Sequence, residues 1–216
     1  MKNILKLTRF TVLAAASLAA APAFAQEFNI DYRNPRGVPP AAYPAVAGPG
    51  VWNNPPGPAA FGPLLNLGGA PTAAGIVGAA IGAFSFDDPA CPVPHSRLYE
   101  DGLVVGAPAG GGMFVVGPLV AGTYEVYTYA WAPGMPANVT QVSVLGSIDG
   151  AQNVGGAWPG WHWEGITYAH HTGIAVAAGG SIFIQLNAST PGSTPRLSGL
   201  QIRFDDGDHN NPNNPN

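Results

Sequence analysis

The chain has 216 residues, and its 8 Lys or Arg and 12 Asp or Glu residues amount to only 9% of the sequence, against about 25% in an ordinary soluble domain. Glycine contributes 30 residues and proline 23. This composition excludes a basic surface for nucleic acid and a charge-rich coiled coil. It also disfavours a mainly helical fold, because glycine and proline break helix interiors.

Residues 1–25 have the pattern of a secretory signal peptide. Two lysines and one arginine precede a short apolar run, and Ala23-Phe24-Ala25 fits the small-x-small cleavage pattern. The apolar run is too short to be a membrane span. The remaining 191 residues hold five arginines, no lysine and all 12 carboxylates, a formal charge of −7. We therefore expect a protein of the periplasm or the exterior that has no integral membrane span and does not bind nucleic acid.

Short runs of β-forming residues, separated by turns rich in glycine and proline, follow one another along the chain. The predicted strands cover residues 27–32, 74–86, 113–119, 123–131, 139–145, 166–168, 174–176, 181–186 and 197–204. A short helical turn is predicted at 95–100, within the irregular segment 87–112. Residues 33–62 are rich in proline and glycine and are expected to wrap the domain.

This spacing of short strands predicts an all-β fold, an antiparallel β-sandwich or jelly roll with Pro/Gly-rich wrapping loops. One domain is expected over residues 26–208, and its length is ample for a single core. The polar residues 209–216 are predicted to form a disordered tail. Cys91 is the only cysteine, so no internal disulfide is expected.

The second half has a characteristic order of motifs. GTYEVYTYAW (122–131) and VTQVSVLGSIDG (139–150) come first, and TYAHHTGIAVAAGGSIFIQL (167–186) and RLSGLQIRF (196–204) follow. This order resembles the galactose-binding-domain-like β-sandwich of malectin-type carbohydrate-binding modules, and it is similar to small secreted bacterial proteins of unknown function. The resemblance covers residues 113–204, about half of the mature chain. It implies a carbohydrate-binding module without catalytic activity.

The resemblance also implies a structural calcium ion between the first and last strands. Glu27, Asp31 and Asp205 are the carboxylates that these strands offer here, and carboxylate oxygens are the ligands that Ca²⁺ prefers. The alternative is that the acidic residues near the end of the chain are simply solvated. No other cofactor is expected.

The most unusual local feature is the segment WPGWHWE, which places Trp158, Trp161 and Trp163 within six residues. Indole faces stack on the C–H faces of sugar rings, while His162 and Glu164 offer partners for sugar hydroxyls. If the segment is extended, the indoles of Trp161 and Trp163 share one face and His162 points the other way. The alternative is that the tryptophans fold inward and close the end of the sandwich, since tryptophan is highly buried on average.

A second aromatic row lies on the predicted strand 123–131. Tyr127, Tyr129 and Trp131 share one face with Glu125. An exposed row of this kind would be a platform for a glycan. The alternative is that a long loop, such as residues 33–62, covers it.

No motif of a known catalytic type is present, such as G-x-S-x-G or H-E-x-x-H. His170 and His171 are adjacent and would point to opposite faces of a strand, so they cannot chelate one ion together. We therefore expect a secreted, non-catalytic protein that binds extracellular carbohydrate through its aromatic residues. The alternative is a structural protein of the matrix or cell surface that associates with itself and binds no small ligand.

Overall fold

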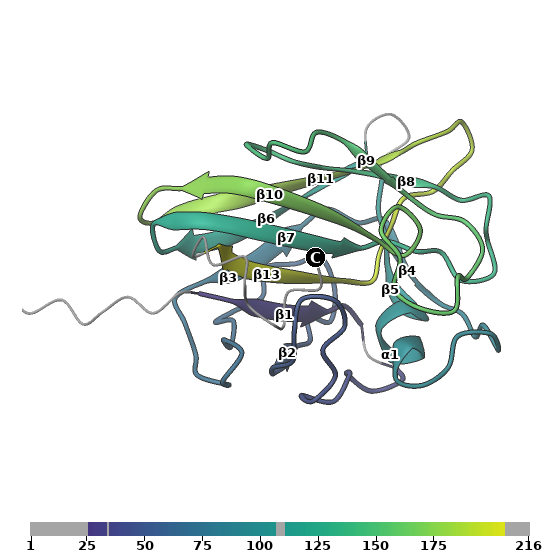
Figure 1. Ribbon diagram of the computed structural model, residues 1–216, viewed down its shortest axis with the longest axis horizontal. Coiled ribbons are helices and arrows are strands. Elements are labelled where there is room, and N and C mark those ends of the chain that lie inside the picture. Colours follow the sequence, from purple (N-terminus) through teal and green to yellow (C-terminus); the bar gives the residue numbers. More distant parts are fainter. Residues whose placement is uncertain (1–25, 34, 107–110, 206–216) are drawn as a thin grey trace, which may run out of the picture.

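The computed structural model describes residues 26–33, 35–106 and 111–205, and these form strands, loops and one short helix (Figure 1). The predicted signal peptide (1–25) and polar tail (209–216) lie outside the described residues. Within the described part, no helix is long and apolar enough to cross a membrane.

Two five-stranded sheets and one small sheet make up the fold. The first sheet contains, in order, β10 (Tyr168–Val176), β7 (Gly122–Tyr129), β13 (Gly199–Asp205), β1 (Phe28–Asp31) and β2 (Trp52–Asn53). The second sheet contains β3 (Gly75–Gly78), β6 (Gly112–Leu119), β11 (Gly180–Ala188), β8 (Thr140–Val144) and β9 (Gln152–Val154). The third contains β12 (Arg196–Leu197), β5 (Asp101–Val104) and β4 (Gly82–Ser85). The helix α1 spans His95–Tyr99.

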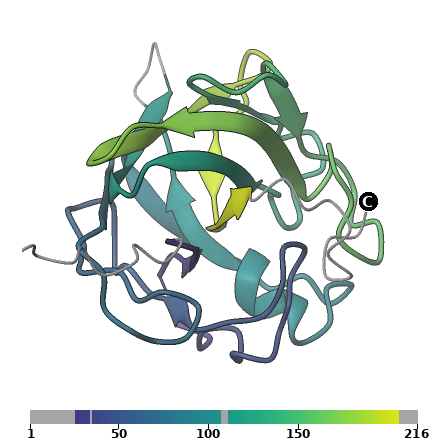
Figure 2. The ribbon, with the colours of Figure 1, turned by 60° about the vertical axis from the view of Figure 1, so that its left-hand side comes forward.

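The two large sheets enclose one apolar core, and the strands curve around it (Figure 2). Alternation along the strands decides which side chains enter this core. In β11, for example, Ile182, Ile184 and Leu186 are buried, whereas Phe183 and Gln185 face outward. Every strand pair in the two large sheets is antiparallel except β1 with β2. The predicted all-β sandwich is therefore confirmed.

Some strand boundaries differ from the predictions. Residues 74–86 form two strands in different sheets, because β3 pairs with β6 and β4 pairs with β5. The short runs 166–168 and 174–176 belong to one strand, β10, which is interrupted by an irregularity between His171 and Ile174. The strands β2, β5 and β9 were not predicted, because each has only two to four residues. The predicted helical turn corresponds to α1.

A buried polar pair on the outer face of the first sheet holds the covering loop, defined as residues 40–50. The Gln201 side chain is fully buried. Its Oε1 accepts hydrogen bonds from the backbone amides of Val46 (3.3 Å) and Ala47 (2.9 Å), and its Nε2 donates to the carbonyl of Gly48 at 3.0 Å. One amide thus satisfies both donors and acceptors of a loop that has no strand partner.

Arg203, two residues further along β13, holds the same loop. Its guanidinium donates to the carbonyls of Ala47 (2.6 Å), Gly48 (3.1 Å) and Phe28 (3.0 Å), and also to Oδ1 of Asn29. Burial lowers the pKa of Arg203, and the carbonyl oxygens supply the negative dipoles that the buried cation requires. The predicted wrapping segment therefore lies over the first sheet, as the purple and blue loops below β1 and β2 in Figure 1.

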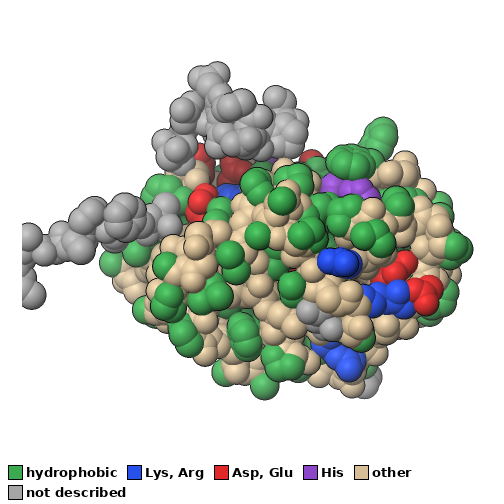
Figure 3. All heavy atoms as spheres, turned by 90° about the horizontal axis from the view of Figure 1, so that it is seen from below, with side chains coloured by type: hydrophobic (Ala, Val, Ile, Leu, Met, Phe, Trp, Pro, Cys, Tyr) green, Lys and Arg blue, Asp and Glu red, His purple; other side chains and the backbone are tan. Residues whose placement is uncertain are grey.

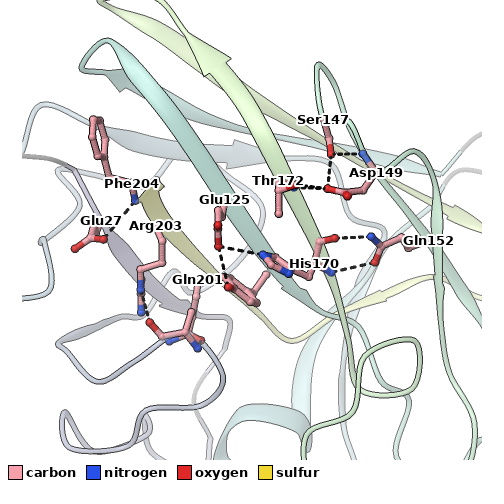
Figure 4. Close-up of polar contacts among 12 residues, drawn as sticks. Glu27, Glu125, Ser147, Asp149, Gln152, His170, Thr172, Gln201, Arg203 and Phe204 are labelled. Carbon is pink, nitrogen blue, oxygen red and sulfur yellow. Dashed lines mark hydrogen bonds and ion pairs between the residues drawn. The ribbon is translucent and has the colours of Figure 1, made fainter. Parts of the chain in front are cut away.

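The free edge of β10 is closed by side chains instead of a strand. The Gln152 amide accepts a hydrogen bond from the backbone amide of His170 at 3.0 Å and donates to the carbonyl of the same residue (Figure 4). Two residues on, the Asp149 carboxylate accepts hydrogen bonds from the backbone amide and the hydroxyl of Thr172. The outward backbone groups of His170 and the backbone amide of Thr172 are therefore already paired on this edge.

We expect Gln201→Leu to lower the free energy of unfolding by about 3 kcal/mol, because it leaves several buried backbone groups of the covering loop without partners. Chemical denaturation with urea measures this change. Gln141→Leu is the matched control: Gln141 is half-buried on β8, and its replacement should change stability by less than about 0.5 kcal/mol. Equal effects of the two substitutions would contradict the role given to Gln201.

Candidate functional site

The candidate site is the tryptophan loop, defined as residues 155–167, which connects β9 to β10. Gly160 has a φ of 92°, a conformation that glycine adopts without strain, and it turns the chain between Pro159 and Trp161. A second turn follows, in which the carbonyl of Trp163 accepts hydrogen bonds from the amides of Ile166 (3.1 Å) and Thr167 (2.8 Å). The hydroxyl of Thr167 accepts a hydrogen bond from the amide of Trp163 at 2.8 Å.

The three tryptophans of the loop differ in their exposure to solvent. Trp161 and Trp163 are 59% and 62% exposed. Trp158 is partly buried and contacts Trp131 (4.9 Å between ring centroids) and Tyr99 (5.7 Å). Figure 3 shows hydrophobic side chains that project from the surface beside histidine side chains. Both sequence interpretations therefore apply in part, since two indoles face solvent and one closes the aromatic cluster below.

His162 points inward, opposite to its two neighbours, as the extended geometry predicts. Its Nδ1 lies 2.6 Å from the Tyr99 hydroxyl, and its Nε2 lies 2.9 Å from the Tyr43 hydroxyl. The Tyr43 hydroxyl also lies 2.7 Å from Nδ1 of His95. Two tyrosines and two histidines thus form a continuous hydrogen-bonded row beneath Trp161, whose ring is 4.6 Å from the His95 ring.

Burial makes both histidines in this row weak bases. It lowers the pKa of His162 to about 3, with a smaller contribution from His95. Burial also lowers the pKa of His95. Both imidazoles are therefore neutral at neutral pH, and each ring has one nitrogen that donates and one that accepts.

The helix α1 supplies His95 and Tyr99 to this row, and it packs directly on the sheet backbone. A Cβ atom at Gly199 would come within 2.5 Å of the Ile30 carbonyl oxygen and 2.9 Å of a Leu98 methyl group. Only glycine therefore lets α1 approach β13 so closely. Sequence reasoning did not connect Tyr43, His95 and Tyr99 with the tryptophan loop, because no local pattern links them to His162.

The predicted platform of Tyr127, Tyr129 and Trp131 is buried, so these side chains do not present a surface. Their exposed fractions are 4%, 0% and 1%. They belong to one aromatic cluster with α1, Trp158 and residues of the covering loop. The hydroxyl of Tyr129 bonds to Oε1 of Gln201, and it also accepts a hydrogen bond from the Val46 amide at 3.1 Å. The alternative in which a long loop covers the aromatic row is the arrangement found.

A second polar group lies beside the cluster, where β7 and β10 pair (Figure 4). The Glu125 carboxylate accepts a hydrogen bond from the Tyr127 hydroxyl at 2.9 Å, and the same oxygen lies 3.1 Å from Nε2 of His170. The rings of Tyr127 and His170 stack at 4.1 Å. His171 points to the other face and bonds to the carbonyl of Gly150 at 2.9 Å. Glu164, the other carboxylate of the predicted site, is exposed.

The three carboxylates predicted to bind calcium do not come together. Asp31 lies opposite Gly199, whereas Asp205 is six residues further along β13, a distance of about 20 Å at 3.4 Å per residue. Glu27 instead accepts a weak hydrogen bond from the Phe204 amide at 3.3 Å. Among the described residues, no group of three or more His, Cys, Asp or Glu side chains is placed to hold a metal ion.

Asp31 and one further acidic side chain, Asp101, are buried without hydrogen-bond partners. Both carboxyl oxygens of Asp31 and both of Asp101 are inaccessible, and none of the four makes a hydrogen bond. Burial raises the pKa of Asp101 to about 7, and burial together with Asp101 raises the pKa of Asp31. The protonated form of a buried carboxyl group avoids the cost of an unpaired buried charge.

Cys91 is buried and reduced. Burial raises the pKa of its thiol to about 12, so the reactive thiolate form is scarce at neutral pH. The lone cysteine therefore lacks the properties of a nucleophile.

No protein-family model matches this chain, and no curated protein sequence matches it. Among solved structures, the chain is similar to the Bacillus subtilis protein YxiM, with a TM-score of 0.47 and 14% sequence identity. The match covers 83% of this chain and 40% of YxiM, so the chain spans less than half the length of that protein.

Asp101→Asn is expected to stabilise the protein at pH 8 by about 1–2 kcal/mol and to have little effect at pH 4. The pKa of Asp101 is higher in the folded state than in the unfolded state. The wild type therefore loses stability as the pH rises from about 4 through about 7. Urea denaturation at several pH values measures the difference. Glu164→Gln, at an exposed carboxylate, should leave the pH profile unchanged, and a profile that Asp101→Asn does not alter would refute the assignment.

Proposed function

We propose that the protein is a secreted, non-catalytic glycan-binding protein that contacts its ligand through Trp161 and Trp163. The observation that carries this proposal is the exposure of two large indoles on a loop whose intervening residue is anchored in the interior. Exposed aromatic side chains that cluster on one surface are typical of binding sites. The resemblance of residues 113–204 to galactose-binding-domain-like modules supports the same function.

The charge around the loop favours an uncharged ligand. Glu164 follows the two exposed indoles in the sequence. Burial raises the pKa of the Tyr168 phenol, and the negative charge of Glu164 raises it further. The nearby His162 is neutral because it is buried. Neutral sugars offer C–H faces to the indoles and hydroxyls to Glu164, whereas an acidic polysaccharide would meet a carboxylate of the same sign.

The remaining polar groups support binding rather than catalysis. Where β7 and β10 pair, His170 meets the Glu125 carboxylate, but among the described residues no serine, threonine or cysteine side chain makes a hydrogen bond to a histidine. Nucleophilic catalysis requires such a contact between nucleophile and base. The buried thiol of Cys91 lacks a base in the same way.

The test is an array of neutral and acidic glycans, followed by titration of the best ligand with tryptophan fluorescence as the readout. We expect Trp161→Ala and Trp163→Ala each to weaken binding at least about tenfold, or ~1.4 kcal/mol. Leu145→Ala is the matched control, since Leu145 is 73% exposed elsewhere and its truncation should leave the affinity unchanged. A protein that binds nothing on the array, or variants that bind like the wild type, would contradict the proposal.

A second candidate function, self-association as a structural protein, is favoured by the outer face of the second sheet. Val77, Met113 and Phe183 are 45%, 47% and 36% exposed there. Phe183 lies opposite Val115 in the β11–β6 pair, and Val115 lies opposite Val77 in the β3–β6 pair. These residues form one apolar row across three strands, and apolar rows of this kind promote association.

If this row mediates self-association, sedimentation velocity should show that the wild type forms dimers or larger species. Phe183→Lys should then shift the protein to monomer, because a charge within an apolar contact is costly to bury. Ile81→Lys, at an exposed position in the turn between β3 and β4, serves as the control. A wild type that is monomeric at all accessible concentrations would eliminate this second function.

A further inference from the structure

The hydrogen-bonded row beneath the tryptophan loop joins three segments that are distant in the sequence. Tyr43 comes from the covering loop, His95 and Tyr99 come from α1, and His162 comes from the tryptophan loop. We call these four residues the latch. Together with the ring contacts of Trp158, they attach residues 157–162 of the tryptophan loop to the rest of the protein.

Within residues 26–33, 35–106 and 111–205, the backbone of this part of the loop has no other attachment. Among the described residues, none from 157 to 162 takes part in a hydrogen bond through its backbone. The nearest backbone anchors are the carbonyl of Gly156, which accepts a hydrogen bond from the Trp131 indole at 2.9 Å, and the turn at Trp163. The position of Trp161 therefore depends on side chains, above all on His162.

All three hydrogen bonds of the latch can form when neither or only one of the two histidines is protonated, but not when both are. A neutral His162 accepts a hydrogen bond from one phenol and donates one to the other, and the Tyr43 hydroxyl likewise donates to one of its two imidazole neighbours and accepts from the other. When both rings are protonated, His162 and His95 each donate toward the Tyr43 oxygen. The Tyr43 proton is then left without an acceptor in the row, and two positive charges lie with ring centroids 4.9 Å apart.

The surroundings provide no compensating negative charge. The groups that face His162 and His95 are Tyr43 from the covering loop, Tyr99 from α1, Tyr129 from β7 and the indoles of Trp158 and Trp161. Within the described part of the chain, no carboxylate forms a hydrogen bond or an ion pair with either ring.

Two titratable groups lie further out. The Cys91 thiol is buried and neutral. The Asp31 carboxyl acts on Tyr43, but its own pKa is raised by burial, so this group is neutral in acid. Neither supplies the negative charge that a protonated latch would need.

We propose that the latch is an acid-sensitive device that holds Trp161 and Trp163 in the binding position at neutral pH and releases the tryptophan loop in acid. This inference rests on the proposed function for its biological meaning, but the release itself needs no ligand. When the loop leaves, the histidines return to water and bind protons with their ordinary affinity. Each histidine that gains a proton on release raises the ratio of open to closed loop about tenfold for every pH unit below its ordinary titration range.

The experiment follows the ligand-free protein by NMR between about pH 7 and pH 4. The indole N–H signals of Trp161 and Trp163 report the loop, and the ring nitrogen shifts of labelled histidine report protonation. We expect the two indole signals to change together with the protonation of His95 and His162, while core methyl signals stay unchanged. Loop signals that do not move before the whole protein unfolds would overturn the proposal.

Variants separate the latch from other titrating groups. Glutamine replaces an imidazole with a side chain that donates and accepts but does not titrate, so the double variant His95→Gln/His162→Gln should lose the pH response of the loop. His170→Gln is the matched control, because His170 lies outside the latch beside Glu125, and this variant should respond like the wild type. Should the double variant fail to fold, Tyr99→Phe, which removes one hydrogen bond of the latch, should shift the loop transition to higher pH. An unchanged transition in Tyr99→Phe would count against the latch.

Glycan titrations at pH 7 and pH 4.5 connect the latch to binding, and we expect at least about tenfold weaker binding at the lower pH. If the loop opens in acid but no glycan binds at any pH, the latch stands and the proposed function fails. If a glycan binds equally at both pH values while the loop opens, the link between the latch and binding is refuted.

Discussion

The side chains of Gln201 and Arg203 bind the covering loop, and this contact determines whether the outer face of the first sheet is buried or exposed. These two side chains satisfy the backbone of residues 44–48, which has no strand to pair with. The loop then excludes water from the aromatic cluster below it. A face that alternation alone would leave exposed is thereby converted into a second core, built largely of tyrosine and tryptophan, in which the hydroxyls of Tyr43, Tyr99 and Tyr129 are hydrogen-bonded.

The aromatic cluster in turn supplies the foundation of the tryptophan loop. The hydroxyls of Tyr99 and Tyr43 both bond to the imidazole of His162, which holds this side chain toward the interior. The two neighbouring residues, Trp161 and Trp163, therefore point toward solvent. The exposure of Trp161 and Trp163 is therefore a consequence of buried hydrogen bonds rather than of local flexibility. The proposed binding surface is joined to the interior through His162, so protonation of the buried histidines would alter the position of the exposed indoles.

Local patterns predicted the sandwich well, because the alternation in runs such as 181–186 directly reflects burial on one side of a sheet. The opposed directions of His162 and its tryptophan neighbours followed from the same rule. The contacts between distant segments did not follow. Tyr43 and His162 are 119 residues apart, and only the path of the covering loop brings them together. Likewise Glu125 meets His170 through the register of β7 and β10. The first and last strands do pair, but their register, which the sequence does not give, sets Asp31 opposite Gly199 and far from Asp205.

The edge of β10 shows how little separates this fold from a different assembly. The side-chain amide of Gln152 bonds to the backbone groups of His170 that a neighbouring strand would otherwise use. A side chain cannot extend this pairing along the strand, as a neighbouring strand would. The sheet thus ends at a side-chain amide, which offers no further backbone groups for another strand to pair with. Without the side chains of Gln152 and Asp149, the outward backbone groups of His170 and Thr172 would be free to pair with a strand from another chain.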